Sequence, residues 1–242
     1  YAHLDVQARV KVAIFSTGDE VEEAGGHRPA SSIFDANRPL LRAMVEALGG
    51  VVTDLGILKD DPQTLAAALA VAAADHDVVL TTGGVSTGEA DYVRAAVESI
   101  GRLVFWRIAI KPGRPVAIGL IPKGSSGRSA VFAGLPGNPV AAFVTFVFIL
   151  RPLLLRLAGA EAIPFQTYPV VARFGYRKKC GRREYVRVSL ALEGGVLTAY
   201  KYQKDGAGVL TSLTQTNGLV DLGEDLTEVV PGMTVLVMTT MW

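Results

Sequence analysis

Apolar positions in the first part of the chain form short continuous runs, separated by longer stretches with helical patterns. Continuous apolar runs of this kind are typical of strands that are buried on both faces, as in a parallel sheet covered by helices. The runs that predict strands are 10–15, 51–58, 77–80, 103–110, 116–121 and 131–133. Because helical patterns alternate with them, we predict an α/β domain over residues 1–160, built as a three-layer, mainly parallel sheet.

Helix signals lie between the predicted strands. Asn37 is a candidate N-cap for the first helix, which Gly49-Gly50 ends. The sequence Asp60-Asp61-Pro62 is typical of the start of a second helix, and residues 91–99 predict a third. The helices therefore fall between consecutive strands, as the layered fold requires.

The most apolar stretch, residues 140–150, predicts a buried helix that ends at Arg151-Pro152. It is much shorter than the roughly 20 apolar residues of a membrane span, so we expect no span. The start of the chain, residues 1–5, lacks the basic start and apolar run of a signal peptide. It also lacks an initiator Met, and we expect the chain to begin inside a longer protein.

The pattern changes at residues 159–164, and beyond them no segment has a convincing helical period. Alternating, β-branched segments predict strands, and Glu193-Gly194-Gly195 is a hairpin turn signal. The predicted strands are 168–174, 184–192, 196–200 and 235–238. We therefore predict a small all-β, barrel-like domain over residues 165–242.

Composition narrows the class of protein. The chain has 242 residues, half of them hydrophobic, which excludes intrinsic disorder of the whole. Its 24 Lys and Arg against 23 Asp and Glu give a net charge of +1, so no overall field favours nucleic acid or a membrane surface. The single cysteine, Cys180, excludes an internal disulfide and indicates a reducing compartment. We expect a cytoplasmic protein that binds no nucleic acid.

Three loops of one kind follow predicted strands. Open parallel sheets bind ligands beyond the carboxyl ends of their strands, where glycine lets the backbone approach and N–H groups face an anion. Each loop could also be only a tight turn, but three on one edge favour a phosphorylated ligand. The candidate binding residues are Thr17, Gly18, Thr82, Gly83, Gly84, Ser86, Pro136, Gly137 and Asn138.

Acidic residues recur near the same edge. Glu20 follows the first loop, Asp60 follows a strand and Asp91 follows the second loop. Carboxylates beside a phosphate site suit Mg²⁺, which prefers oxygen ligands. Helix capping is the alternative, and it applies most directly to the pair Asp60 and Asp61.

Basic residues stand in and after the predicted strand 103–110. Alternation would place Arg107 and Lys111 on one face, because strand side chains repeat every second residue. Two fixed cations on one face can hold an oxyanion. The alternative is an edge strand protected by charge. A second basic cluster, residues 173–187, is interpreted as a solvated hairpin.

Five segments stand in the order of a known family. They are 17–20 (TGDE), 33–37 (IFDAN), 82–93 (TGGVSTGEADYV), 110–115 (IKPGRP) and 135–140 (LPGNPV). The chain resembles molybdopterin molybdenumtransferase, the MoeA family, which includes the E domain of gephyrin. The resemblance covers nearly the whole chain and implies a molybdopterin-binding α/β fold followed by a small β-barrel.

The resemblance also implies an activity. The family takes adenylylated molybdopterin and molybdate, releases AMP and yields molybdenum cofactor with the help of Mg²⁺. Carried over to this chain, it makes the catalytic residues Glu20, Asp60, Asp91, Arg107 and Lys111, with Asp60 and Asp91 as metal ligands. Arg182 resembles the family's basic residue in the barrel, whereas Ala207 stands where relatives often have Ser.

Further expectations follow from the same resemblance. Family members carry two more domains before the first one seen here, and those domains help them dimerise. A homodimer is therefore expected for the full-length protein, with a molybdopterin adenylyltransferase as a possible partner. If the chain is the whole protein, it should bind ligand better than it turns over.

Two other functions fit parts of the sequence. A scaffold module of the gephyrin type would keep the fold without the chemistry, but it would have no need for Glu20, Asp60, Asp91 and Lys111. The related molybdopterin adenylyltransferase shares the Thr-Gly-Gly strand end but lacks the β tail. Both features favour the transferase.

Overall fold

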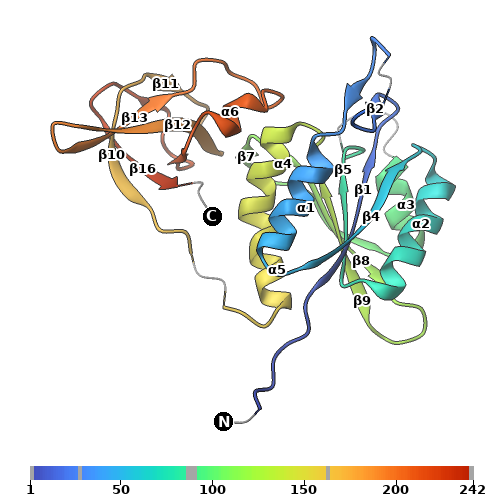
Figure 1. Ribbon diagram of the computed structural model, residues 1–242. Helices are drawn as coiled ribbons and strands as arrows, with labels where there is room; N and C mark the ends of the chain where they lie inside the picture. The colour runs from blue at the N-terminus through green and yellow to red at the C-terminus, as the bar shows by residue number, and fades with distance from the viewer. Residues whose placement is uncertain (1–2, 27–28, 86–91, 162–163, 240–242) are drawn as a thin grey trace. The chain divides into compact units, whose positions relative to one another are not determined.

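The computed structural model describes residues 3–26, 29–85, 92–161 and 164–239. It divides into two compact units that are not continuous in sequence (Figure 1). The N-terminal unit uses the chain up to Arg107, then Pro115–Asn138 and the segment from Thr145. The C-terminal unit uses Ile108–Arg114, Pro139–Val144 and the described residues from 164 onward. The predicted limits 1–160 and 165–242 stay a prediction about where independently folding domains begin.

The N-terminal unit is built on a six-stranded sheet with the order β4-β1-β5-β9-β8-β6. The pairs β4–β1, β1–β5 and β5–β9 are parallel. Strand β8 is antiparallel to both of its neighbours, β9 and β6. This arrangement confirms the predicted α/β, mainly parallel sheet. The strand bounds are β1 Lys11–Thr17, β4 Val51–Leu58, β5 Val78–Thr82, β6 Arg102–Arg107, β8 Pro115–Pro122 and β9 Ser129–Leu135.

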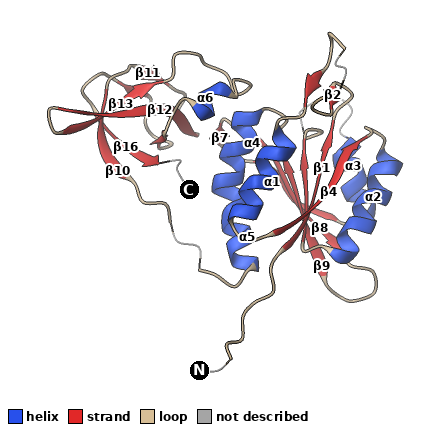
Figure 2. Cartoon of the chain, viewed as in Figure 1, coloured by secondary structure: helices blue, strands red, loops and turns tan. Residues whose placement is uncertain are grey.

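Helices cover both faces of this sheet, so the unit has three layers: helices, sheet and helices. Helices α1 (Asn37–Ala47) and α5 (Arg151–Leu157) lie on one face, and α2 (Pro62–Asp75) and α3 (Tyr92–Ile100) on the other (Figure 2). The sheet is buried because its strands carry apolar side chains on both faces, as Phe15 and Phe132 do. A short parallel pair, β2 (Val21–Glu22) and β3 (Ile33–Phe34), stands apart from the main sheet.

Acidic side chains cap two of these helices. The Asp35 carboxylate accepts hydrogen bonds from the backbone N–H groups of Asn37 and Arg38, at 3.1 and 3.0 Å. Asn37 is therefore the first residue of α1, and its predicted role as N-cap is wrong because Asp35 already accepts from the free N–H groups. Asp61 caps α2 through a 2.7 Å bond from the Thr64 N–H.

Loss of the α2 cap should cost measurable stability. We expect Asp61→Ala to lower the free energy of unfolding by about 1 kcal/mol, since the Thr64 N–H loses its partner. Denaturant unfolding checks this. Asp75→Ala, at the other end of the same helix, is the matched control and should change little. Equal losses in both variants would contradict the capping role.

The apolar helix is longer than predicted. Helix α4 (Pro139–Thr145) continues through a π-helical turn (Phe146–Leu150) into α5. The predicted stop at Arg151-Pro152 is wrong, because the helix continues through Pro152 to Leu157, and the π-helical turn directly before it replaces the regular i→i−4 bonding where the proline N–H is missing. The run Pro139–Leu157 has 19 residues and is apolar enough to span a membrane by length and composition alone, but 56% of its apolar window is buried inside the protein.

The C-terminal unit is a small barrel. Its sheet runs β13-β10-β16-β14-β12-β7, and the additional pairing of β13 with β12 closes a ring of five strands. This confirms the predicted barrel-like all-β domain, whose core contains Val170, Val188 and Val237. The elements are β7 Ile110–Lys111, β10 Tyr168–Ala172, β11 Tyr176–Arg177, β12 Arg183–Glu193, β13 Val196–Lys201, α6 Thr211–Thr214, β14 Gly218–Leu222, β15 Glu228–Val229 and β16 Thr234–Thr239.

The predicted strand 103–110 is divided between two sheets. Strand β6 ends at Arg107 in the N-terminal unit, whereas Ile110 and Lys111 form β7 beside β12. The segment Ile108–Arg114 is fixed to β12 by the Arg183 N–H, which donates to the Ala109 carbonyl at 3.0 Å. The two ends of the segment are joined by a 3.1 Å bond from the Ile108 N–H to the Arg114 carbonyl. The argument that strand alternation places Arg107 and Lys111 on one face is therefore wrong.

Candidate functional site

The three predicted loops meet at one edge of the N-terminal sheet. Strands β1, β5 and β9 are consecutive in the sheet and parallel, so the loops after them leave from the same edge. From β1 the chain goes to β4 on one side, and from β4 it returns to β5 on the other side. Ligands of open α/β sheets bind at such a switch point, between strands whose connections diverge. The topology thus places the candidate site at the ends of β1 and β5.

Close backbone packing joins the first two loops. Gly83 has φ +89°, and a Cβ atom added there would lie 2.2 Å from the Thr17 carbonyl oxygen. Only glycine permits both that conformation and that approach. The Gly83 N–H also donates to the Leu135 carbonyl at 3.2 Å, which ties the second loop to the third. The loops after β1, β5 and β9 therefore form one connected surface.

The side chain of Asn37 forms a brace, that is, a pair of hydrogen bonds that joins the loops after β5 and β9. Its side-chain amide donates to Thr82 Oγ1 at 2.8 Å and to the Gly137 carbonyl at 2.7 Å. The Thr82 hydroxyl in turn donates to the Pro136 carbonyl at 3.2 Å. Asn37 and Thr82 are buried, while Gly137 and Asn138 are exposed at the tip of the loop. This role of Asn37 leaves no signal in its sequence position, which is that of a helix N-cap; only Asp35, two residues earlier, makes a second cap unnecessary.

The brace predicts a selective defect. We expect Asn37→Ala to weaken binding of a phosphorylated ligand about tenfold, because the loops after β5 and β9 lose two shared hydrogen bonds of roughly 0.5–1.5 kcal/mol each. Titration of a phosphorylated nucleotide such as AMP checks this. Thr53→Ala, an exposed position on β4, is the control. Unchanged binding in Asn37→Ala would remove the brace from the site.

The predicted acids differ in their surroundings. Asp60 is half-buried and accepts a hydrogen bond from the Thr17 hydroxyl, so it lies against the first loop. Asp61 caps α2, so helix capping, the alternative role for this pair of acids, belongs to Asp61. Asp60 therefore remains a candidate site residue. Glu20 is exposed, with its carboxylate close to Gly18. Asp91 and Ser86 lie outside the described residues.

A metal centre is not formed within the described part of the chain. The described residues contain no group of three or more His, Cys, Asp or Glu side chains that could hold an ion. Asp60, one of the two predicted metal ligands, therefore belongs to no group of three or more such side chains among the described residues. Mg²⁺ often binds proteins through one or two carboxylates together with phosphate oxygens, so Asp60 fits that mode only with a phosphorylated ligand present.

The second group of predicted residues belongs to the C-terminal unit. Lys111 and Arg182 both contact the Glu184 carboxylate, at 3.3 Å from Nζ and 2.6 Å from Nε. The Tyr176 hydroxyl donates to the same carboxylate at 2.6 Å and accepts from Lys111 Nζ at 3.2 Å. Arg107, by contrast, is exposed at the end of β6 in the other unit. The structure brings Lys111 together with Arg182 on one carboxylate.

This cluster shifts the titration of its members. Burial alone would raise the pKa of Glu184, but hydrogen bonds from Tyr176, Arg182 and Lys111 lower that pKa overall. Burial, followed by the hydrogen bond to Glu184, raises the pKa of Tyr176. A carboxylate with a depressed pKa stabilises the fold above its unfolded pKa, and that contribution is lost as the pH falls through the folded value. The cluster thus keeps Glu184 charged at neutral pH.

Part of the basic cluster at 173–187 is not a solvated hairpin. Lys178 is buried and donates to the backbone carbonyls of Gly223, Glu224 and Leu226 at 2.7–3.3 Å. Arg187 donates to Ser212 Oγ at 2.6 Å, and burial lowers its pKa. Because Lys178 and Arg187 make these internal contacts, the interpretation as a solvated charge run is wrong for both of them.

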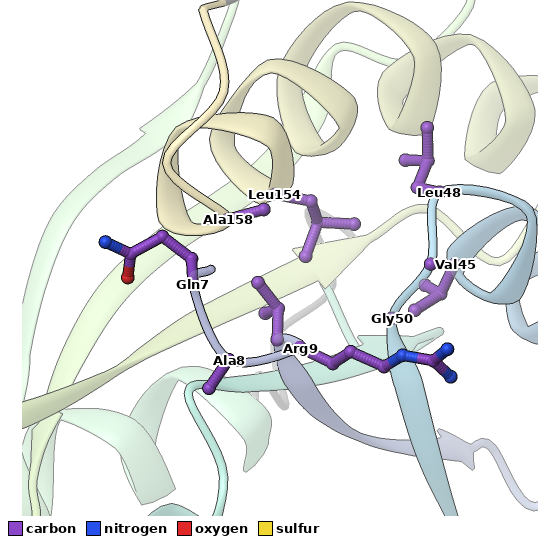
Figure 3. Close-up of a pocket in the computed structure, with 10 residues that line it drawn as sticks. Gln7, Ala8, Arg9, Val45, Leu48, Gly50, Leu154 and Ala158 are labelled. Carbon is purple, nitrogen blue, oxygen red and sulfur yellow. The ribbon is translucent and has the colours of Figure 1, made fainter. Parts of the chain in front are cut away.

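One cavity of about 130 Å³ lies at the opposite edge of the N-terminal sheet (Figure 3). It is lined by residues just before β1, the end of α1 and the end of the apolar helix, among them Val45, Leu48 and Leu154. Figure 3 shows Gln7 and Arg9 extending to opposite sides of it. Because it lies at the amino ends of β1 and β4, this cavity is separate from the glycine-rich loops.

Fold and site together define an α/β protein whose glycine-rich loops meet at the carboxyl ends of its central strands, and which also carries a β-barrel. Residues 13–156 match the family model described as "Probable molybdopterin binding domain", and residues 169–240 match "MoeA C-terminal region (domain IV)". The chain belongs to the molybdopterin-binding domain family, with a MoeA-type C-terminal region. This confirms the family resemblance that the five sequence segments indicated.

Individual relatives agree with this assignment. The chain is 34% identical over 238 residues to the molybdopterin molybdenumtransferase of Haemophilus influenzae, covering 98% of this chain and 57% of that protein. It is 34% identical to the enzyme of that name from a Nostoc species, with 96% and 53% covered. A molybdopterin biosynthesis MoeA protein from Pyrococcus horikosii has a similar structure, with a TM-score of 0.79, 29% identity, and 97% and 55% covered. The chain thus spans about half the length of these relatives.

Proposed function

We propose that this chain takes part in molybdenum cofactor biosynthesis as the ligand-binding and catalytic part of a molybdopterin molybdenumtransferase. The observation that carries the proposal is the junction of the loops after β1, β5 and β9, where Gly83 packs on Thr17 and Asn37 joins Thr82 to Gly137. Relatives that match nearly the whole chain bear the name of this enzyme. The substrates are adenylylated molybdopterin and molybdate.

The proposed reaction has two steps, insertion of molybdate and hydrolysis of the phosphoanhydride, and the atoms balance in each. Molybdate exchanges one oxygen for the two sulfurs of the dithiol: two Mo–S bonds form, and the oxygen leaves with the two thiol protons as water. Molybdenum keeps its oxidation state. Hydrolysis of the phosphoanhydride uses one water: a P–O bond forms, the bridging P–O bond breaks, and AMP leaves.

The residues divide this work by their chemistry. The glycine loops, with Thr17, Gly18, Gly84 and Gly137, offer backbone N–H groups to the phosphates, while Gly83 holds the loops together. Asp60 keeps the Thr17 hydroxyl oriented, because that hydroxyl donates to it. Lys111 and Arg182 hold the oxyanion, as fixed cations bind oxyanions by charge-assisted hydrogen bonds. Arg107 stays a candidate for the same task, and Glu20 and Asp91 stay candidates for acid–base work.

Several finer points belong to this proposal. Mg²⁺ would be held by Asp60, with phosphate oxygens completing its shell, and Asp91 is the second predicted ligand. The assembly would be a homodimer of the full-length protein, served by a molybdopterin adenylyltransferase in the cytoplasm. These points rest on the family resemblance.

Two other functions account for less. A gephyrin-type scaffold leaves the contact of Thr17 with Asp60 and the Lys111–Glu184–Arg182 cluster unexplained. An adenylyltransferase leaves the barrel unexplained, since residues 169–240 match the MoeA C-terminal region. The transferase uses all of these features.

AMP release tests the proposal directly. The full-length protein is incubated with adenylylated molybdopterin with and without sodium molybdate, and AMP is measured by chromatography. We expect AMP release that depends on molybdate and is not restored by sulfate. Tight binding of the nucleotide without molybdate-dependent release would favour the scaffold, and no nucleotide binding would overturn the proposal.

A further inference from the structure

A buried carboxylate stands at the centre of the cation cluster in the C-terminal unit. The Glu184 side chain is 1% exposed, whereas its partners Lys111 and Arg182 are 50% and 35% exposed. Glu184 lies on β12, where it is the register partner of Lys111 on β7. A fully buried acid that holds two partly exposed cations directs their remaining donors outward.

The hydrogen bonds in the cluster have fixed directions. Tyr176 has one hydroxyl proton, which it donates to Glu184 Oε2, so its oxygen accepts from Lys111 Nζ. The Lys111 ammonium also lies over the Tyr176 ring, 5.7 Å from its centroid. Arg182 uses Nε on Glu184 Oε1. Each cation is therefore held by a defined atom.

Donors remain beyond these contacts. Lys111 has three N–H groups and Arg182 has five. Among the described residues, Lys111 uses two of its donors on Tyr176 and Glu184, and Arg182 uses Nε on Glu184. The Glu184 charge offsets one of the two cations, so these side chains keep a net charge of +1; the Asp205 carboxylate, which also acts on Lys111, is itself paired with Lys201. A small oxyanion is the ligand that such outward N–H groups suit best.

We infer that Glu184 and Tyr176 are positioning residues, which hold Lys111 and Arg182 in the orientation that binds the molybdate oxyanion. This inference rests on the proposed function, because molybdate is the oxyanion of that reaction. Neither residue needs to touch the ligand. The carboxylate fixes both cations, and the phenol fixes the ammonium.

The position of this ion cluster favours such a role over a purely structural one. A buried charge is expensive to desolvate, and an apolar replacement of similar volume is often as stable. A barrel that needed only stability would be served by apolar side chains at Tyr176 and Glu184. A buried acid whose cations reach solvent instead serves a ligand that arrives from solvent.

The chain provides a matched control on the same strand. Glu193 ends β12 and accepts hydrogen bonds from the Tyr200 hydroxyl and from Arg173, so it repeats the Tyr–Glu–Arg chemistry. Its side chain is 40% exposed. Glu193→Gln thus removes the same charge and the same kinds of contact at the other end of β12.

The test measures AMP release while molybdate and adenylylated molybdopterin are varied separately. For Glu184→Gln we expect the molybdate KM to rise at least tenfold, with the nucleotide KM within threefold of the original. Tyr176→Phe, which keeps the carboxylate and the ring, should raise the molybdate KM three- to tenfold. It also serves as the readout if Glu184→Gln does not fold. Glu193→Gln should leave both values unchanged.

The outcomes separate the two proposals. A rise in the molybdate KM alone supports the positioning role. Equal rises in both KM values, or values matching those of Glu193→Gln, overturn it and leave the transferase intact. If the unaltered chain shows neither molybdate-dependent AMP release nor molybdate binding by calorimetry, the proposed function fails and the inference fails with it.

Discussion

Replacing Gly83 by alanine is expected to abolish binding of adenylylated molybdopterin, with a loss of affinity of at least about a hundredfold, or roughly 2.7 kcal/mol. The new Cβ would lie 2.2 Å from the Thr17 carbonyl oxygen, so the backbone of one loop must move. The φ of +89° adds strain for any L side chain. Because the displaced segment carries the N–H groups assigned to the phosphates, the damage falls on the ligand first.

Gly25→Ala is the matched control for this prediction. Gly25 has φ +91°, nearly the same as Gly83, but an added Cβ there meets no atom within 4 Å. It therefore has the same backbone strain without the collision. Titration of the nucleotide and thermal unfolding of both variants check the prediction. If Gly83→Ala binds as Gly25→Ala does, the close packing of the two loops has no part in binding.

Replacing Lys111 by glutamine is expected to raise the molybdate requirement about tenfold to a hundredfold, the equivalent of one charge-assisted contact of roughly 1.5–3 kcal/mol. Molybdate is a dianion, and a protein of net charge +1 attracts it only through local cations. The affinity for the nucleotide should change less, because the glycine loops hold the phosphates. AMP release measured against molybdate concentration checks this.

The control for Lys111→Gln removes a cation of the same unit. Arg177 is 86% exposed and pairs with Glu228, so Arg177→Gln lowers the net charge equally without touching the cluster. It should leave the molybdate requirement unchanged. A collapse of nucleotide affinity in Lys111→Gln, with an unchanged molybdate requirement, would make Lys111 a phosphate ligand.

Local patterns were sufficient to predict the layers of the fold. The apolar runs that became β1 and β5 are buried on both faces, and this burial is what makes a continuous apolar run informative. The same reasoning failed at residues 108–111, because alternation is blind to which sheet a strand joins. Ile110 and Lys111 keep an extended conformation but pair with β12, far away in the sequence. Pro152 misled in a similar way, because a proline usually ends a helix, whereas this helix continues past it after a π-helical turn.

The sequence could predict those residues of the candidate site that lie within a glycine-rich loop, but not those that reach the loops from elsewhere in the fold. Thr17, Gly83 and Gly137 could be proposed because each follows a strand in a glycine-rich segment. Asn37 reaches Thr82 and Gly137 across the fold, and Glu184 reaches Tyr176 and Lys111 in the same way. Contacts at such sequence separations leave no periodic signal in a single chain. These braces became visible only once the strands were in register.

Strand β7 makes the barrel dependent on residues encoded far upstream of it. A recombination event at residues 160–165 would transfer β10 to β16 without Ile108–Arg114, and the transplanted β12 would meet whatever loop the recipient supplies. The acquired barrel would keep Glu184, Tyr176 and Arg182 but exchange the lysine that Glu184 and Tyr176 orient. Swapping barrels between relatives therefore changes the oxyanion-handling group together with its support, unless residues 108–114 are carried along as a second inherited segment.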